Sequence, residues 1–375
     1  MPSIVRNTVR LLGFFPVLLA ILFLLACTHM TPPIEKIRKS DQSLDWGRNQ
    51  PQAPDRARHV MNVKHPFEWW YFDGQLDNGQ FFVGAFLDPS FVTEKPQAVF
   101  SLYDPDWKKE THLVDLERKD MNSSTSDIYL ETPVGFIHRS GNDAYQVQWD
   151  IGGIQAYFTM TTLVPGWIPK NPDGSLVSEG CDFFWTVHQA RNRIEGTITR
   201  GGISTKVSGI GYADHNWGIR PLNEIAEKWI WGRIVDERYT VIFADVDYIN
   251  PSCRSTPLYI ARGDKILVGT GSPEIRQKDF AVHPTLKRFY PRLVSIRYDH
   301  QGVKIDITIH YKGLAEEVDL LTVSNYHPFV QWIARTFFAR PTYFRVLAEY
   351  NGTITASGID DRISGQCIYE LMGFK

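Results

Sequence analysis

After residue 58, short apolar runs alternate with polar turn residues, and this pattern predicts a chain built of β-strands. The first run is 68–76, Asp77-Asn78-Gly79 marks a hairpin turn, and 80–87 returns as its partner strand. Aromatic residues stand at both odd and even positions of the first run, so we expect both of its faces to be buried. Further strands are predicted at 96–103, 111–117, 127–131, 134–138, 144–149, 154–163, 183–188, 194–199 and 204–210.

The strand pattern starts again near residue 220, which indicates a second domain. Its predicted strands are 228–233, 239–248, 257–261, 265–269, 292–298, 303–310, 343–350, 353–359 and 365–371. The segment 327–340 differs, because its apolar residues recur at helical spacing and predict a helix that closes a barrel end or contacts a membrane. We therefore predict an all-β protein with two domains, 58–220 and 221–375, each a sandwich or a barrel.

The beginning of the chain predicts a lipoprotein signal peptide over residues 1–26. Arg6 and Arg10 precede an uncharged, mostly apolar run that ends in Leu24-Leu25-Ala26-Cys27. This ending is similar to a bacterial lipobox, which implies cleavage before Cys27 and lipidation of its thiol. The alternative is a helix that remains in the membrane, for which the run is short.

The stretch 27–57 is polar and rich in proline, so we expect a lipidated tether before the folded part. Because Thr28 rather than aspartate follows the cysteine, the expected location is the bacterial cell envelope, at the outer membrane and facing the periplasm. The membrane is thus one expected partner, reached through the lipid on Cys27.

Composition narrows the possible functions. Aromatic residues make up 13% of the chain, which favours strands and a large apolar pocket for a lipophilic small molecule. The net charge of −2 and the absence of a long basic run argue against nucleic-acid binding. The spacing of cysteines and histidines indicates no metal site, and one pair among Cys181, Cys253 and Cys367 could form a disulfide in the periplasm.

The central stretch 209–218, Gly-Ile-Gly-Tyr-Ala-Asp-His-Asn-Trp-Gly, carries the densest group of polar and aromatic residues. Its glycines allow two strands to approach closely, so the polar residues between them are expected to point at a defined target. His215 titrates near neutral pH, and Asp214 or Asn216 could fix its tautomer. The alternative is a polar turn between the domains.

The strand around Asp245 offers a second candidate for chemistry. With a period of two, Tyr239, Phe243 and Asp245 share one face. Burial of Asp245 on this apolar face would raise its pKa and keep it protonated, which is the state of a general acid. The alternative is a solvated strand end. Glu68, beside two tryptophans, poses the same question.

Three ordered motifs resemble the carotenoid 1,2-hydratase (hydroxyneurosporene synthase) and AttH-like lipocalin-like proteins. They are the central stretch, Glu68-Trp69-Trp70-Tyr71, and the closing 364–370 strand. The resemblance implies two lipocalin-like β domains packed together around an apolar pocket, and no cofactor. Two departures are Phe243, where the hydratases have tyrosine, and Ala213, where histidine is expected.

The resemblance also implies site residues. The catalytic candidates are Asp245, His215 and Trp217, and the pocket candidates are Glu68, Trp69, Trp70, Tyr71, Asp214, Asn216, Trp231 and Phe243. In this hypothesis Asp245 protonates an alkene, Trp217 and Trp70 stabilise the cation, and His215 holds the water. The predicted function is a hydratase, isomerase or cyclase acting on an isoprenoid or polyketide alkene. The alternatives are a non-catalytic lipid carrier and a structural envelope lipoprotein.

Overall fold

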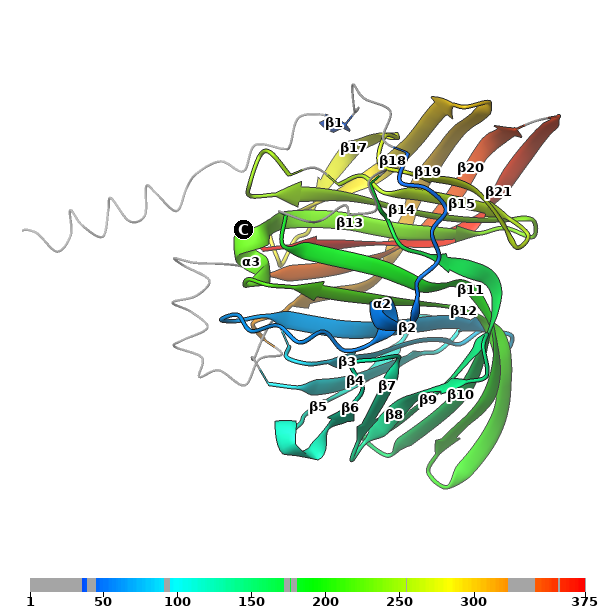
Figure 1. Ribbon diagram of the computed structural model, residues 1–375. Helices are drawn as coiled ribbons and strands as arrows, with labels where there is room; N and C mark the ends of the chain where they lie inside the picture. Colours follow the sequence, from blue (N-terminus) through cyan, green and yellow to red (C-terminus); the bar gives the residue numbers. More distant parts are fainter. Residues whose placement is uncertain are drawn as a thin grey trace, which may run out of the picture. The chain divides into compact units, whose positions relative to one another are not determined.

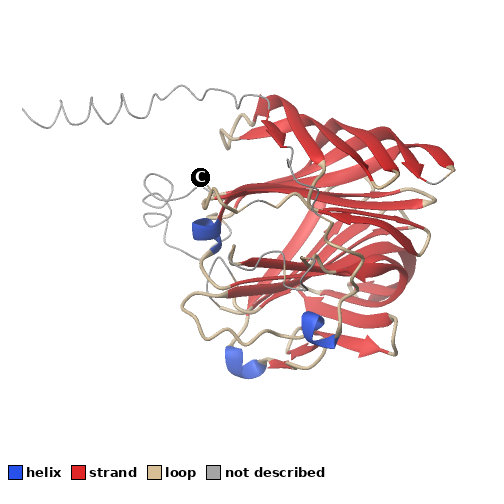
Figure 2. Cartoon of the chain, turned by 45° about the horizontal axis from the view of Figure 1, so that its top comes forward, coloured by secondary structure: helices blue, strands red, loops and turns tan. Residues whose placement is uncertain are grey.

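The computed structural model describes residues 36–38, 45–90, 95–171, 176, 181–253, 255–322, 341–356 and 358–374. Strands dominate this part of the chain, and its helices are short turns (Figure 2). The elements up to residue 218 are β1 (Lys36–Arg38), α2 (Ala53–Arg56), β2 (Phe67–Leu76), β3 (Phe81–Leu87), β4 (Gln97–Tyr103), β5 (Lys109–Asp115), η1 (Arg118–Asp120), β6 (Asn122–Ser123), β7 (Tyr129–Thr132), β8 (Gly135–Ser140), β9 (Ala144–Ile151), β10 (Ile154–Trp167), β11 (Phe183–Arg200) and β12 (Ile203–Gly218).

The second half of the chain continues in the same way. Its elements are α3 (Leu222–Ile225), β13 (Ala226–Val235), β14 (Tyr239–Tyr248), β15 (Leu258–Arg262), β16 (Lys265–Thr270), β17 (Glu274–Val282), β18 (Phe289–His300), β19 (Val303–Asp319), β20 (Thr342–Ala356) and β21 (Ile359–Gly373). The prediction of an all-β protein is confirmed.

The strands form two antiparallel sheets (Figure 1). The N-terminal sheet has the order β5-β4-β3-β2-β12-β11-β10-β9-β8-β7-β6, and the C-terminal sheet has the order β1-β17-β18-β19-β20-β21-β13-β14-β15-β16. The change of sheet falls between Gly218 and Ala226, and both sheets belong to the compact unit Glu35–Lys375. Antiparallel hairpins dominate because most consecutive strands are joined by short turns, such as the one at Gly79 with a φ of +85°.

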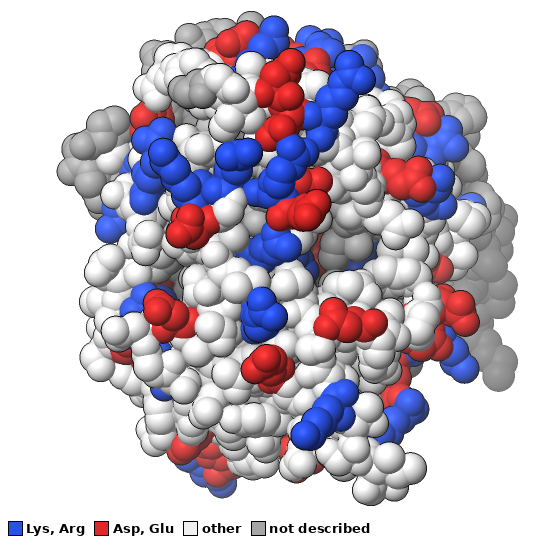
Figure 3. Space-filling model, turned by 90° about the vertical axis from the view of Figure 1, so that its right-hand side faces the viewer, with Lys and Arg blue, Asp and Glu red and all other residues white. Residues whose placement is uncertain are grey.

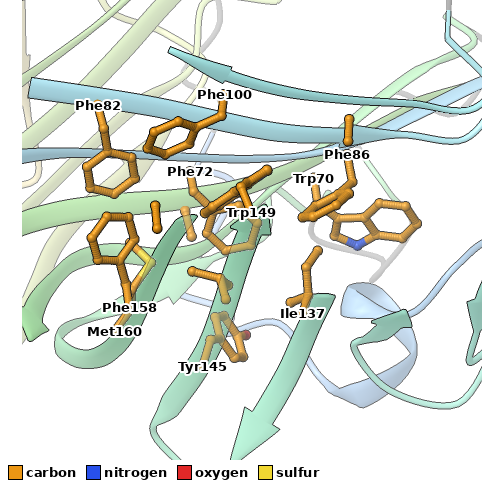
Figure 4. Packing of buried hydrophobic residues seen from close by; sticks show 14 of the residues in the cluster. Trp70, Phe72, Phe82, Phe86, Phe100, Ile137, Tyr145, Trp149, Phe158 and Met160 are labelled. Atoms are coloured by element: carbon orange, nitrogen blue, oxygen red, sulfur yellow. The ribbon is translucent and has the colours of Figure 1, made fainter. Parts of the chain in front are cut away.

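Strand β2 is buried on both faces, as its aromatic pattern predicted. Trp70 and Phe72 point into the core inside the N-terminal sheet, where Figure 4 shows them among Phe82, Phe86 and Trp149. Alternation sends Trp69 and Tyr71 to the opposite face, toward the C-terminal sheet. Strand β2 therefore separates the core of the N-terminal sheet from the layer between the two sheets.

The central glycines bring β12 against β2. A Cβ on Gly209 would lie 2.2 Å from the carbonyl oxygen of Gln75, and one on Gly211 would lie 2.5 Å from that of Asp73. Any other residue would push the strands apart, so the expected close approach is confirmed. The rest of the motif, from Tyr212 to Gly218, continues in register with β2.

Strand β11 corrects one prediction. The segments 183–188 and 194–199 are parts of one strand, and register shifts between Val187 and Gln189 and between Gln189 and Asn192 mark bulges inside it. The polar residues at these bulges are typical of turns, and this is why the sequence predicted two separate strands. His188 lies at the first of these shifts, and its ring contacts that of His215 on the inner face of the N-terminal sheet, with centroids 5.4 Å apart.

The C-terminal sheet encloses a core of its own. Tyr239, Val241 and Phe243 of β14 point into it, as the period-two pattern predicted. Both sheets thus have separate apolar interiors, and their facing surfaces form a third buried layer. On the outer face shown in Figure 3, basic and acidic side chains lie interspersed.

The stretch 27–57 is not a free tether over the residues described. β1 pairs with β17, Trp46 is 2% exposed and its backbone donates to Gly269, and α2 lies at 53–56. Proline and polar residues made this stretch resemble a linker, but long-range pairing overrides that local signal. The lipobox, Cys27 and the predicted helix at 327–340 lie outside the described residues.

Two further features concern the cysteines and the helices. Cys181 and Cys253 form a disulfide, whereas Cys367 is a free thiol whose pKa burial raises to about 12. Among the residues described, none of the helices is long and apolar enough to cross a membrane.

Candidate functional site

A cavity of about 640 Å³ lies between the two sheets. One wall comes from β2 to β5, β11 and β12, and the other from β13, β14 and β19 to β21. Apolar and aromatic side chains dominate both walls, including Val99, Trp185, Trp229, Trp231, Val246 and Met372. Such a volume and lining suit a lipophilic small molecule.

Asp214 places a carboxyl group in the cavity wall with only 6% of the residue exposed. Its Oδ2 accepts hydrogen bonds from Trp185 Nε1 at 3.0 Å and from the Tyr212 hydroxyl at 2.9 Å, and its Oδ1 accepts one from Asn216 Nδ2 at 3.0 Å. Burial raises the pKa of Asp214 to about 7, although the hydrogen bonds from Trp185 and Tyr212 oppose this rise. A large fraction of Asp214 is therefore protonated at neutral pH.

A second polar group in the cavity surrounds Arg345, which is 2% exposed. Its Nη2 donates to Glu370 Oε1 at 2.8 Å and to the Tyr343 hydroxyl at 2.7 Å, while Nη1 donates to the Tyr103 hydroxyl at 2.9 Å. Tyr71 joins this group through its hydroxyl, 3.2 Å from Glu370 Oε1. These residues come from both sheets and hold the walls together by charge-assisted hydrogen bonds.

A further buried ion pair, Arg233 with Asp73, joins the sheets beside the cavity. Burial raises the pKa of Asp73, and Arg233 opposes that rise. Neither residue lines the cavity, so their role is to fix the packing of the sheets.

A third polar group lies on the other face of β2 and β12. Glu68 Oε1 is 2.8 Å from His59 Nδ1 and 2.8 Å from His215 Nε2, and the backbone of His59 also donates to it at 2.9 Å. Burial acts to raise the pKa of Glu68, but the hydrogen bonds of His215 and His59 outweigh it and lower the pKa. Burial lowers the pKa of His215, against the effect of Glu68, and that of His188 falls well below its ordinary value.

Aromatic rings hold this third group in place. The His215 ring stacks on Trp70 with centroids 4.6 Å apart, and the His59 ring stacks on Trp217 at 3.8 Å. The ligand atoms of His59, Glu68 and His215 lie within 4.8 Å of one another, which is close enough for a metal ion. Hydrogen bonds already account for this arrangement, because both imidazoles share one carboxylate oxygen.

The structure divides the residues that the sequence grouped into one site. Those that line the cavity are Trp69, Tyr71, Asp214, Asn216, Trp217 and Trp231. Glu68, Trp70 and His215 lie behind this wall, on the inner side of the N-terminal sheet, and Trp217 links the two groups through His59.

Asp245 and Phe243 are not part of the cavity lining, which corrects their expected grouping with His215 and Trp217. Asp245 is 1% exposed, and its Oδ2 accepts a hydrogen bond from Gln277 Nε2 at 2.6 Å. The shared face of β14 is buried, which excludes the alternative of a solvated strand end, and it points into the C-terminal core. The cavity borders the other face, through Ala244 and Val246.

Sequence reasoning assigned no role to several residues of these groups, namely His59, Trp185, Tyr343, Arg345 and the glutamate that ends the closing motif, Glu370. Tyr343 and Arg345 stand one residue apart on a strand face, a spacing that could have marked them. His59 lies in a stretch without regular pattern, and no local signal distinguishes it.

Comparisons with known proteins place the chain among a group of related sequences. A family model described as carotenoid hydratase CrtC matches residues 160–280. The quinolone epoxide rearrangement protein asqO of Emericella nidulans is 24% identical over 239 residues, and the match spans 58% of this chain and 61% of that protein. Hydroxyneurosporene dehydrogenase of Chlorobaculum tepidum is 22% identical over 304 residues, covering 69% of this chain and 76% of that protein.

Solved structures show the same fold at low identity. An AttH-like protein of Nitrosomonas europaea has a TM-score of 0.56 at 13% identity and covers 82% of this chain and 93% of its own. CghA with Sch210972 has a TM-score of 0.57 at 12% identity, with 91% and 99% covered. Kievitone hydratase from Nectria haematococca has a TM-score of 0.52 at 11% identity, with 87% and 97% covered.

Proposed function

We propose that the chain, which is similar to carotenoid hydratase and AttH-like proteins, is a hydratase- or isomerase-type enzyme that protonates a carbon–carbon double bond of a lipophilic substrate. Relatives described as a kievitone hydratase and an epoxide rearrangement protein support this class of reaction. The substrate class is an isoprenoid or polyketide alkene, which suits the apolar walls of the cavity.

The observation that carries the proposal is the place of Asp214, a carboxyl group only 6% exposed in an apolar cavity wall, where burial raises its pKa to about 7. An alkene is a weak base, so its protonation needs a neutral acid held out of water. The carboxyl group of Asp214 meets this need at neutral pH, and the three donors around it stabilise the carboxylate that remains after the proton leaves.

The first step breaks the O–H bond of Asp214 as the π electrons form a C–H bond. It leaves a carboxylate on the protein and a tertiary cation on the substrate. The ring faces of Trp185 and Trp231 in the cavity wall are suited to stabilise that cation. Water then forms the C–O bond and gives its proton to Asp214, or a neighbouring C–H bond returns its proton and shifts the double bond. The first outcome is hydration and the second is isomerisation.

In this proposal His215 is a positioning residue. It does not line the cavity, but with Glu68 it holds His59, and His59 stacks on Trp217, which does. The three-residue chain therefore fixes one aromatic wall of the cavity.

The experiment that tests the proposal uses purified full-length protein incubated with lipid extract from its host. Mass spectrometry would detect species that gain one water or change isomer, with Asp214→Asn and Asp245→Asn run in parallel. We expect product with the wild-type protein and with Asp245→Asn, provided that the latter folds, and none with Asp214→Asn. Product formation by Asp214→Asn at the wild-type rate would refute the assigned acid.

The same experiment tests the second candidate function, a lipid carrier. A carrier needs the apolar cavity but no acid. If the wild-type protein and Asp214→Asn both retain the same lipid and neither converts it, the protein is a lipid carrier and the proposal of an enzyme is refuted.

We also propose that lipid on Cys27 holds the protein at the outer membrane, on the periplasmic side. The lipobox-like sequence before Cys27 supports this proposal. Cys27→Ser should move the protein from the membrane fraction to the soluble fraction and abolish metabolic labelling with a fatty acid. Unchanged labelling would exclude this anchor.

A further inference from the structure

Three tyrosine hydroxyls surround Arg345, and they differ in whether the hydroxyl proton is already donated to an acceptor within the protein. The Tyr103 hydroxyl accepts from Arg345 and donates to Glu316. The Tyr71 hydroxyl has Glu370 and Asp73 as acceptors for its single proton, each at 3.2 Å. Both of these tyrosines therefore have their hydrogen-bonding protons engaged within the protein.

The Tyr343 hydroxyl is different, because it accepts from Arg345 at 2.7 Å and its own proton has no acceptor among the residues that the structure describes. Tyr343 lines the cavity. Burial raises the pKa of Tyr343 well above its ordinary value, although Arg345 opposes the rise. The hydroxyl therefore stays a donor over the whole pH range of interest, and its bond to a cation strengthens it as a donor.

The charges around Tyr343 balance. Arg345 pairs with Glu370 at 2.8 Å, and Lys109 pairs with Glu316 at 2.5 Å. No cation in this group is left over for a carboxylate or phosphate on the ligand. An uncharged acceptor oxygen, in a carbonyl or hydroxyl group, is what a single neutral donor recognises.

Asp214 and Tyr343 belong to the same cavity but to opposite sheets. Asp214 pairs in register with Tyr71, and the Tyr71 hydroxyl reaches Glu370, which pairs in register with Arg345. The two groups therefore lie in facing walls of one cavity of about 640 Å³, and Tyr71 and Glu370 connect these walls by a hydrogen bond. One ligand can contact both.

We propose that Tyr343 binds an uncharged carbonyl or hydroxyl oxygen of the substrate while Asp214 faces its double bond, so that the substrate is an oxygenated lipophile and not a pure hydrocarbon. This inference rests on the proposed function, whose substrate class it narrows. Tyr343 selects the substrate, and the proton transfer belongs to Asp214.

The test compares three probes by quenching of tryptophan fluorescence in the full-length protein. They are farnesylacetone, the hydrocarbon in which CH₂ replaces its carbonyl, and farnesoic acid. A buried neutral hydrogen bond changes affinity by roughly 3- to 10-fold, so the wild-type protein should bind the ketone that much more tightly than the hydrocarbon. In Tyr343→Phe this ratio should fall to about one, with the hydrocarbon affinity unchanged.

The matched control is Tyr157→Phe, a tyrosine of β10 that lies outside the cavity lining and should keep the wild-type ratio. An unchanged ratio in Tyr343→Phe, a wild-type ratio near one, or no binding of any probe overturns the inference. Tighter binding of farnesoic acid than of the ketone overturns the neutral-ligand assignment.

Binding is measured without turnover, which separates this inference from the proposed function. Asp214→Asn should keep the ratio of ketone to hydrocarbon affinity even though it makes no product. A retained ratio without any product in the lipid-extract experiment refutes the enzyme alone. Product without a retained ratio refutes the role of Tyr343 alone.

Discussion

Two buried carboxyl groups lie on paired strands, and their pKa values are shifted in opposite directions. They are Asp214 of β12 and Glu68 of β2. Burial acts on both in the same direction, toward a higher pKa. The pKa of Asp214 rises to about 7, while that of Glu68 falls below its ordinary value. The two side chains lie on opposite faces of the same two strands, one in the cavity wall and the other behind it.

The difference comes from the groups that donate to each carboxylate. Asp214 accepts from an indole, a phenol and an amide, all neutral, and the nearby Glu370 and Asp73 add repulsion. Glu68 accepts from two imidazoles and a backbone N–H. Neutral donors offset only part of the cost of burying a charge, whereas groups that can themselves carry a positive charge outweigh it. Asp214, in the cavity wall, can therefore hold a proton at neutral pH, whereas Glu68, behind the wall, stays a carboxylate.

The largest expected effect is that of Asp214→Asn on activity. Loss of the proton donor should lower kcat by roughly 10²- to 10⁴-fold, because general acid catalysis contributes that much. Asp245→Asn, a buried aspartate on the far face of β14, should leave kcat of the folded protein within about threefold of wild type, because it does not line the cavity. Steady-state kinetics on the product identified by mass spectrometry would measure kcat of both variants. A larger loss of kcat in Asp245→Asn than in Asp214→Asn would refute Asp214 as the proton donor.

The next effect is the pH dependence. Asp214 must be protonated to act, so log kcat should fall with a slope of −1 above about pH 7. Since the pKa of Asp214 is higher in the folded chain than its ordinary value of 3.8, the folded state holds more protons between about pH 4 and 7. That contribution to stability is lost as pH rises through 7, and its full size is about 4 kcal/mol.

The pH dependence of Glu68 has the opposite sign. Its pKa is lowered on folding, so its stabilisation is present above its ordinary value of 4.5 and is lost as the pH falls. Denaturant titrations from about pH 2 to 8 would measure the stability contributions of both carboxyl groups, and Asp214→Asn should remove the decline that Asp214 causes between about pH 4 and 7. If the difference in stability between the wild-type protein and Asp214→Asn does not change with pH in this window, the raised pKa of Asp214 is contradicted.

Glu68→Gln should act mainly on stability. It removes the charge that the two histidines stabilise and places an amide nitrogen at the Oε2 position, 3.3 Å from the backbone N–H of His59, which should cost about 1–3 kcal/mol of unfolding free energy. Glu195→Gln, on the exposed side of β11, serves as the control and should change stability by less than about 0.5 kcal/mol. A loss of kcat as large as that of Asp214→Asn without any loss of stability would show that Glu68 takes part in the chemistry.

The smallest effect should come from the donors to Asp214. Trp185→Phe or Tyr212→Phe removes one hydrogen bond that lowers the pKa of Asp214, so the pH profile of kcat should move upward by less than about one unit. Tyr157→Phe should leave the profile in place. A downward shift in either donor variant would mean that these groups stabilise the protonated acid instead.

Local pattern was enough to predict the strands, both buried faces of β2 and the close approach at Gly209 and Gly211, because each follows from residue types and their spacing within one strand. Periodicity also predicted that Asp245 shares a face with Phe243 but left open whether that face is buried. It could not tell which of two buried faces borders a cavity, since that depends on how the sheets pack. Sequence patterns could not identify Arg345 for the same reason. Its hydrogen bond to Tyr103 spans 242 positions of the chain and depends on how the two sheets pack.

The division of the cavity between two sheets also bears on how such proteins diversify. Each sheet keeps a hydrophobic interior of its own, and the binding walls lie outside both interiors. Substitutions in the walls can therefore change the ligand without altering either core. The exceptions are the residues that join the two walls, such as Arg345 and Tyr103, because changing either one alone would also loosen the packing of the sheets.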